Sequence, residues 1–145
     1  MSYPVADLRA FLSGRWRIVR RIGDARLGIV GRLTGHATFT PAPDGLIHDE
    51  NGDLQFGAYH GPATRRYRLA IDQPSAGDLH HADGSLFHRL DLASGRSEIL
   101  HQCGSDQYRG RYRVLHDDCF AVTWHVTGPR KQYRLATLHT RMEGA

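Results

Sequence analysis

The chain has 145 residues, of which 40% are hydrophobic and 23% are charged, and its formal net charge at pH 7 is +4. This length predicts one domain over residues 1–145, large enough to bury a core without disulfides. No apolar run approaches the roughly 20 residues of a membrane helix. The N-terminal residues also lack the apolar centre of a signal peptide. We therefore expect a cytoplasmic protein with no membrane partner.

The 19 basic residues outnumber the 15 acidic ones, and all of them except Lys131 are arginines. They are dispersed along the chain without a basic run or tail, so a nucleic-acid partner is only weakly indicated. The two cysteines, Cys103 and Cys119, are too few for a disulfide scaffold. Common enzyme fingerprints such as CxxC, GxSxG, HExxH and the P-loop are absent. Catalysis and the oligomeric state, including a homodimer, stay open.

Residues 4–12 form the clearest helix candidate, because their apolar side chains recur at helical spacing. Strands with period-two alternation follow at residues 15–22 and 31–40. In the first strand, Arg20 is an anomaly because it lies on the face that carries the apolar residues. Residues 46–58 predict a hairpin around the dipeptide Asn51-Gly52, which is typical of a type I′ turn.

The second half of the chain consists of further alternating runs joined by short turns, at residues 64–71, 78–82, 85–92, 96–103, 106–115, 120–126 and 133–140. In one run His88 shares a face with three leucines, and in another Tyr108 and Tyr112 alternate with arginines. The pattern predicts an all-β fold, an antiparallel barrel of about eight to ten strands with a short N-terminal helix. Closure removes the sheet edges and leaves room for one small ligand.

The segment Gly14-Arg15-Trp16 resembles the Gly-x-Trp signature of the lipocalin and fatty-acid-binding-protein superfamily. In those calycin barrels an arginine late in the last strand packs across the tryptophan. Arg141 stands in a matching position, and cation–π stacking would explain the pairing. This resemblance implies a lipocalin-like barrel in which Trp16 and Arg141 form a structural clamp.

A second resemblance covers nearly the whole chain and is to an uncharacterised bacterial domain-of-unknown-function family with a calycin-like barrel. It implies the fold and carries no activity. The matching elements are Gly14-x-Trp16 with Arg20, Glu50-x-Gly52, Arg66-Tyr67, Asp83-Gly84-Ser85-Leu86-Phe87-His88, His101-x-Cys103-x-x-Asp106-x-Tyr108 and Trp124-x-Val126-x-Gly128-Pro129-Arg130-Lys131.

The alternation places an unusual number of polar residues on the predicted inner wall. We expect them to line a pocket for a small, anionic and partly apolar molecule. An inward arginine needs a carboxylate partner, for which Glu50 and Asp106 are available, or an anionic ligand. If Arg20 and Lys131 both pair internally, the network is structural instead. The candidate ligand-binding residues are Arg20, Glu50, Tyr67, His88, His101, Cys103, Asp106, Tyr108, Tyr112, Lys131 and Tyr133.

The same residues leave two alternatives open. Imidazole and thiolate groups at His88, His101 and Cys103 suit zinc or a similar ion, so the barrel could bind a metal or haem. A small barrel enzyme is the other alternative, with His101 and Asp106 as a general base and Cys103 as a nucleophile. The sequence identifies no cofactor.

Overall fold

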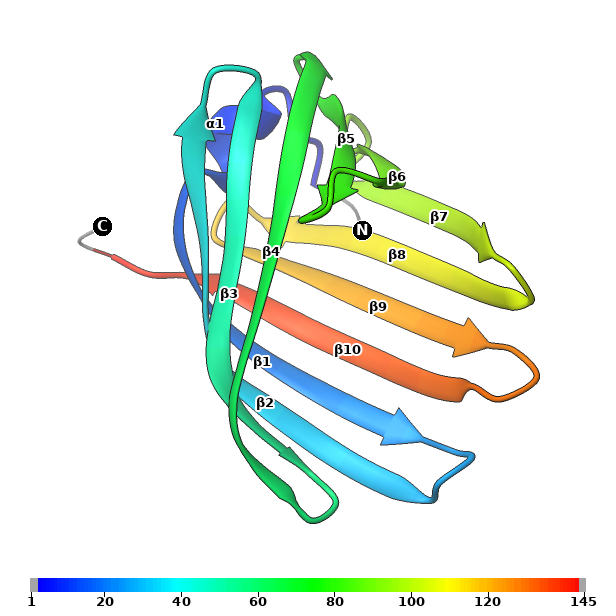
Figure 1. Cartoon of the computed structure of the whole chain (residues 1–145). Coiled ribbons are helices and arrows are strands. Elements are labelled where there is room, and N and C mark those ends of the chain that lie inside the picture. Colours follow the sequence, from blue (N-terminus) through cyan, green and yellow to red (C-terminus); the bar gives the residue numbers. More distant parts are fainter. Residues whose placement is uncertain (1–2, 144–145) are drawn as a thin grey trace.

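A computed structural model describes residues 3–143. It contains one short helix and ten antiparallel strands in a nearly closed barrel (Figure 1), which confirms the predicted all-β class. The elements are α1 (Leu8–Leu12), β1 (Gly14–Asp24), β2 (Ile29–Ala42), β3 (Gly45–Phe56), β4 (Tyr59–Gln73), β5 (Ala76–His81), β6 (Leu86–Asp91), β7 (Arg96–Cys103), β8 (Asp106–His116), β9 (Cys119–Thr127) and β10 (Gln132–Arg141).

The first strand, β1, pairs with the last strand, β10, so the two terminal strands lie in the middle of the sheet. The sheet order is β6-β5-β4-β3-β2-β1-β10-β9-β8-β7, so the seam lies between β6 and β7. β1 pairs with β10 from Trp16 opposite Arg141 to Asp24 opposite Tyr133. β5 and β6 have six residues each, whereas β4 has 15, so the strands beside the seam are much shorter than their neighbour β4. The β5–β6 hairpin therefore covers only part of β4 (Figure 1).

Helix α1 covers one end of the barrel and is shorter than predicted. It begins at Leu8 because the Asp7 side chain caps it, accepting a hydrogen bond from the backbone N–H of Ala10 at 3.0 Å. With five residues it is far too short to cross a membrane, and no other helix is present in the described chain. Beneath it the Arg141 guanidinium stacks 4.2 Å from the Trp16 ring, as predicted.

The hairpin predicted around Asn51-Gly52 is wrong, because β3 runs through this dipeptide and the chain turns at Gly57-Ala58 instead. The glycine serves strand packing, since Gly52 lies directly opposite Gly35 of β2. A Cβ on Gly35 would lie 2.5 Å from the Gly52 Cα and 2.0 Å from the Asn51 carbonyl oxygen. Two glycines thus allow the backbones of β2 and β3 to approach closely at this point.

The alternation predicted for residues 85–92 also fails in one place. The register between β5 and β6 shifts, so that Leu79 pairs with His88 but His80 pairs with Leu86. The extra residue on β6 is Phe87, which packs against the core while Leu86 is 55% exposed. A β-bulge adds a residue to one strand and re-aims the side chains around it, which explains the change of face.

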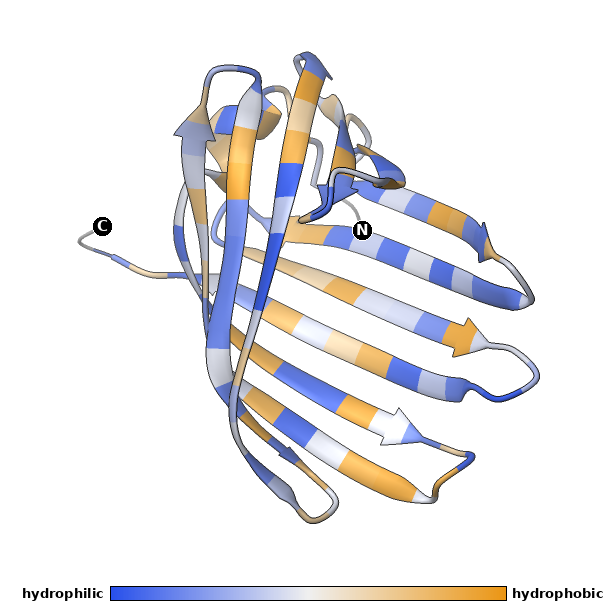
Figure 2. Ribbon diagram, in the orientation of Figure 1, coloured by the Kyte–Doolittle hydropathy of each residue, from blue (hydrophilic) through white to orange (hydrophobic). Residues whose placement is uncertain are grey.

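Over most of the other strands the alternation predicted the two faces correctly, although Cys103 at the end of β7 is exposed. Arginines alternate with less polar residues along β8 (Figure 2), and the inward apolar residues of β8 and β9 form one core cluster with the helix. Val114, Phe120 and Val122 are buried in this cluster, whereas Arg109 and Arg111 are exposed on the opposite face. The sheet therefore has an apolar lining interrupted by a few polar side chains, and these define the candidate site.

Candidate ligand site in the barrel

An ion pair between Arg20 and Glu50 lies at the centre of the barrel. The two guanidinium Nη atoms donate to the Glu50 carboxylate at 2.9–3.0 Å, and Nε donates to the Thr137 hydroxyl at 2.7 Å. Both charged side chains are buried. Although burial opposes ionisation, the Arg20 charge lowers the pKa of Glu50 to about 2. Glu50 is thus the predicted carboxylate partner, and this buried arginine is already neutralised.

Neutral histidines surround this ion pair. Burial lowers the pKa of His139 to about 3 and also lowers that of His48. His48 stacks on Phe39 at a centroid distance of 4.2 Å, and its Nε2 lies 3.6 Å from a Glu50 oxygen. This distance is too long for a hydrogen bond, and Nε2 is buried without another partner. The His48 ring therefore offers a free polar atom to the barrel interior.

A cluster of aromatic rings centred on Phe87 forms the wall beside the seam. The Phe87 ring stacks on Trp124 at 5.1 Å on one side and on His81 at 4.6 Å on the other. Further members of this aromatic wall are Tyr67, His88, His101, Tyr108 and Tyr112. Six strands, β4 to β9, contribute to it, so the wall joins both sides of the seam across the interior.

His88 sits in the aromatic wall as a neutral residue. Burial lowers its pKa to about 4. Its Nδ1 lies 3.0 Å from the Arg89 carbonyl oxygen, which requires a proton on Nδ1 and leaves a lone pair on Nε2. That Nε2 is buried without a hydrogen-bond partner, between Tyr112 and Trp124. The predicted inward position of His88 is thus correct, and its free nitrogen is an acceptor.

Arg65 is the cation that the site leaves available. It lies opposite Glu50 in the β3–β4 pairing and lines the same cavity. Its guanidinium Nη1 makes a long contact of 3.5 Å with the Tyr67 hydroxyl. None of the ion pairs found between residues 3 and 143 involves Arg65. Since Arg20 and Glu50 cancel each other, Arg65 gives the inner wall a positive charge.

Two small cavities adjoin these charged residues. One has a volume of about 60 Å³ and lies between the ion pair and the aromatic residues Tyr67, Tyr112 and Trp124. The other has a volume of about 80 Å³ and lies toward Leu33 and Leu54. Arg20, Glu50 and Arg65 line both. Sites for drug-sized ligands span roughly 300–1,000 Å³, so the closed interior accommodates only part of such a molecule.

Several predicted residues lie at the open rim instead of the centre. Lys131 pairs with Asp106 at 3.2 Å and contacts the Tyr108 hydroxyl at 3.4 Å, while Tyr133 is half-buried nearby. The hydrogen bond from Lys131 to Asp106 raises the pKa of the lysine. Both cations of the predicted anion pocket, Arg20 and Lys131, thus have internal carboxylate partners.

The His–Cys alternatives gain no support from the geometry. Cys103 is exposed at the end of β7, where an inward position was predicted, and Asp106 is engaged by Lys131. Within the described chain, the one group of three potential metal ligands is the exposed cluster His116, Asp117 and Asp118 at the other end of the barrel. The residues His88, His101 and Cys103 do not converge on one coordination position.

Several residues of the site are absent from the set predicted from the sequence. Arg65 shares inward parity with Tyr67, His48 shares it with Glu50, and His139 shares it with Thr137. Each of these three lies inside a run that was predicted to be a strand, so the alternation of that run already places it on the inner face. Phe87 is different, because the bulge that turns it inward leaves no mark in the alternation.

Solved structures with the same architecture include a lyase and a protein of unknown function. The S-type phycobiliprotein lyase CPES from Guillardia theta matches with a TM-score of 0.58 and 12% identity, over 94% of this chain and 91% of that chain. A DUF3598-family protein of unknown function from Nostoc punctiforme matches with a TM-score of 0.64 and 13% identity, over 97% of this chain and 51% of that chain. This chain therefore spans about half the length of the Nostoc protein. At such identities the likeness establishes a shared fold alone.

Comparison with curated proteins gives no match. The family of unknown function DUF6314 matches residues 12–141, which include both the Trp16–Arg141 clamp and the central ion pair. The predicted membership in a domain-of-unknown-function family with a calycin-like barrel is thereby confirmed. The chain belongs to the DUF6314 family.

Proposed function

We propose that the open end of the barrel binds a small molecule with an aromatic or apolar body and an anionic group. The observation that carries this proposal is Arg65, a cation on the inner wall beside an aromatic surface and without an ion-pair partner in the described chain. A guanidinium binds carboxylate or phosphate through two parallel hydrogen bonds. The anion preference first inferred for Arg20 and Lys131 thus belongs to Arg65.

Rings of the aromatic wall, beside the seam between β6 and β7, would hold the apolar part of the ligand. Phe87, Trp124 and Tyr67 form a continuous stacked surface there. The free Nε2 of His88 supplies an acceptor beside it, and the His48 Nε2 is a second buried polar atom without a hydrogen-bond partner. The protein of the same fold from Guillardia theta is a phycobiliprotein lyase, which supports the idea that a barrel of this shape accommodates a substrate. The small interior volume favours a ligand that enters from the rim.

An aromatic anionic dye tests the proposal. Anilinonaphthalene sulfonate is expected to bind with one site per chain, and Arg65→Gln should weaken it about tenfold or more, because a hydrogen bond to a charged group contributes about 1.5–3 kcal/mol. Arg66→Gln is the matched control, since Arg66 is on the same strand but pairs with Asp49 on the outer face. The neutral dye Nile red should bind both variants equally. Equal sulfonate affinity in the two variants would contradict an anion site at Arg65.

A further inference from the structure

The outer face of β7–β10, β1 and β2 carries arginines in rows across the strands. One row runs Glu98, Arg111, Thr123, Ala136, Arg21 and Arg32, and the next runs Leu100, Arg109, His125, Arg134 and Gly23. We call this surface the basic face. Arginines that are dispersed along the sequence thus lie together on one side of the barrel. The sequence did not indicate this surface, because it contains no basic run.

The charges of the basic face are poorly compensated compared with those of the opposite face. On β3–β6, Arg66 pairs with Asp49 at 2.6 Å and Arg89 with Asp72 at 3.0 Å. Arg68 is likewise paired there, with Asp44 at 2.9 Å. On the basic face, the ion pair recorded among the described residues joins Glu98 to Arg111, at 3.3 Å. The barrel therefore carries its excess positive charge on one side.

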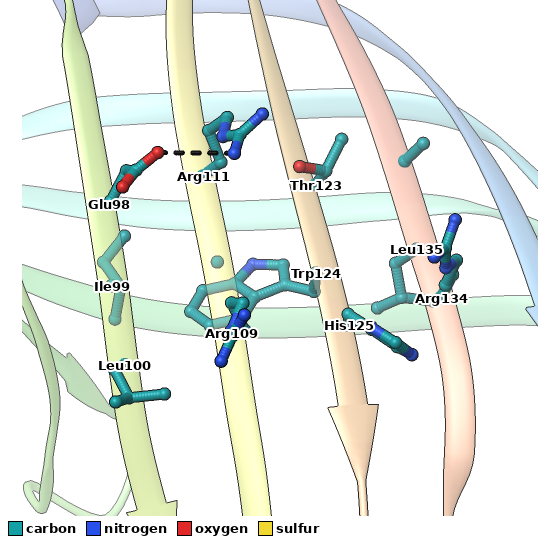
Figure 3. Close-up of a pocket in the computed structure, with 12 residues that line it drawn as sticks. Glu98, Ile99, Leu100, Arg109, Arg111, Thr123, Trp124, His125, Arg134 and Leu135 are labelled. Carbon is teal, nitrogen blue, oxygen red and sulfur yellow. Dashed lines mark ion pairs between the residues drawn. The ribbon is translucent and has the colours of Figure 1, made fainter.

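A hollow in the basic face has a volume of about 570 Å³. Thr123 and its cross-strand neighbour Ala136 contribute short side chains to it. The longer side chains of Arg109, Arg111 and Arg134 lie around Thr123 (Figure 3). Short residues between long ones leave room for an atom group to approach the sheet, while the surrounding guanidinium groups are exposed. The hollow lies outside the barrel and is separated from the candidate ligand site by the sheet.

We propose that the basic face binds the phosphate backbone of duplex nucleic acid. Alternate residues of one strand are about 7 Å apart, which places Arg109 and Arg111 at a separation comparable to that of neighbouring phosphates. Guanidinium groups bind phosphates bidentately. No phenylalanine, tyrosine or tryptophan stands in the strand rows described above, and His125 is their single ring, so the run of stacking rings that single strands require is missing from them. Because phosphate contacts carry no base information, we expect binding to be independent of base sequence.

The test measures anisotropy of a labelled 20-bp DNA duplex of arbitrary sequence between 50 and 200 mM salt. The variant Arg109→Gln/Arg111→Gln/Arg134→Gln should bind at least about tenfold more weakly at 50 mM salt. The slope of log affinity against log salt concentration should fall in magnitude by about 2.7, because each neutralised phosphate contributes about 0.9. The matched control Arg66→Gln/Arg68→Gln/Arg89→Gln removes the same charge from the opposite face. Because these arginines do not contact the duplex in the proposed complex, the control should change the affinity for the duplex by less than about twofold.

A second variant tests the hollow without removing an arginine. Thr123→Glu places a carboxylate in it and should also abolish most duplex binding, while circular dichroism verifies the barrel in every variant. The proposal is overturned if the unmodified protein does not bind at 50 mM salt or if both triple variants lose affinity equally. It is also overturned if polyglutamate competes better than unlabelled duplex at equal charge, which would identify an acidic polypeptide as the partner.

Discussion

Arg20 and Glu50 form a bidentate ion pair across the barrel interior, with β2 between their strands in the sheet and each side chain 7% exposed. A buried ion pair contributes little net stability, because the loss of hydration offsets the attraction between the charges. Loss of one partner is costly, since the other charge then stays buried alone. The pair is therefore better understood as a device that fixes the polar centre of an apolar barrel.

Replacing one member of this pair should destabilise the protein far more than replacing both. We expect Glu50→Gln to lower the free energy of unfolding by about 3–5 kcal/mol, because Arg20 loses its counter-charge. The double variant Arg20→Met/Glu50→Leu should recover most of this loss. Urea unfolding at pH 7 measures both values. If the double variant is less stable than Glu50→Gln, the ion pair itself holds the strands in register.

The barrel could be predicted from sequence because most strands follow strict alternation. β8 illustrates this, since Arg109 and Arg111 face solvent while Gly110 and Tyr112 face inward, as the pattern predicts. Gly52 could not be assigned in the same way, because an Asn-Gly turn and an Asn-Gly within a strand, with Gly52 opposite another glycine, have the same local sequence. Arg65 was accessible to the pattern, whereas the pairing of Lys131 with Asp106 depends on tertiary positions.

The close approach of β2 and β3 leads to a prediction about glycine. Gly35→Ala should lower the free energy of unfolding by about 1–3 kcal/mol or more, since its Cβ would overlap the backbone of Asn51 and Gly52. Gly23→Ala is the matched control, because a Cβ there meets no atom within 4 Å. Chemical denaturation of the two variants gives the difference. Equal stability would mean that β3 turns at Asn51-Gly52 after all.

The buried histidines predict loss of stability in mild acid. His88 and His139 have folded-state pKa values of about 4 and about 3, below the unfolded value of 6.5. Between the folded-state and unfolded-state pKa values, the unfolded chain binds more protons than the folded chain. The stabilising effect of the neutral histidines is therefore fully present above pH 6.5 and is lost as the pH falls. At pH 5 each histidine should cost about 2 kcal/mol, while Glu50 contributes only below its own unfolded pKa.

Urea unfolding at pH 7 and pH 5 measures this effect, and His139→Phe provides the comparison. The His139 ring stacks on Phe120 at 4.0 Å, so a phenyl ring keeps the contact and removes the titrating group. The variant should lose about 2 kcal/mol less than the unmodified protein between the two pH values. An identical pH dependence in both proteins would show that His139 titrates normally and is accessible to water.

Two adjacent residues of β6 distinguish the bulged register from simple alternation. Phe87 stacks on Trp124 at 5.1 Å, whereas Leu86 is 55% exposed. We expect Phe87→Ala to cost about 2–3 kcal/mol, because the ring is only half-buried, and Leu86→Ala to change stability by less than about 0.5 kcal/mol. Removing the Phe87 ring should also admit water to Trp124 and shift its fluorescence emission to the red, while Trp16 stays buried under α1. With strict alternation along β6, residue 86 would face inward instead, and Leu86→Ala would be the variant that destabilises the barrel and shifts the emission. The two spectra therefore decide which of the neighbouring side chains forms the aromatic wall of the ligand site.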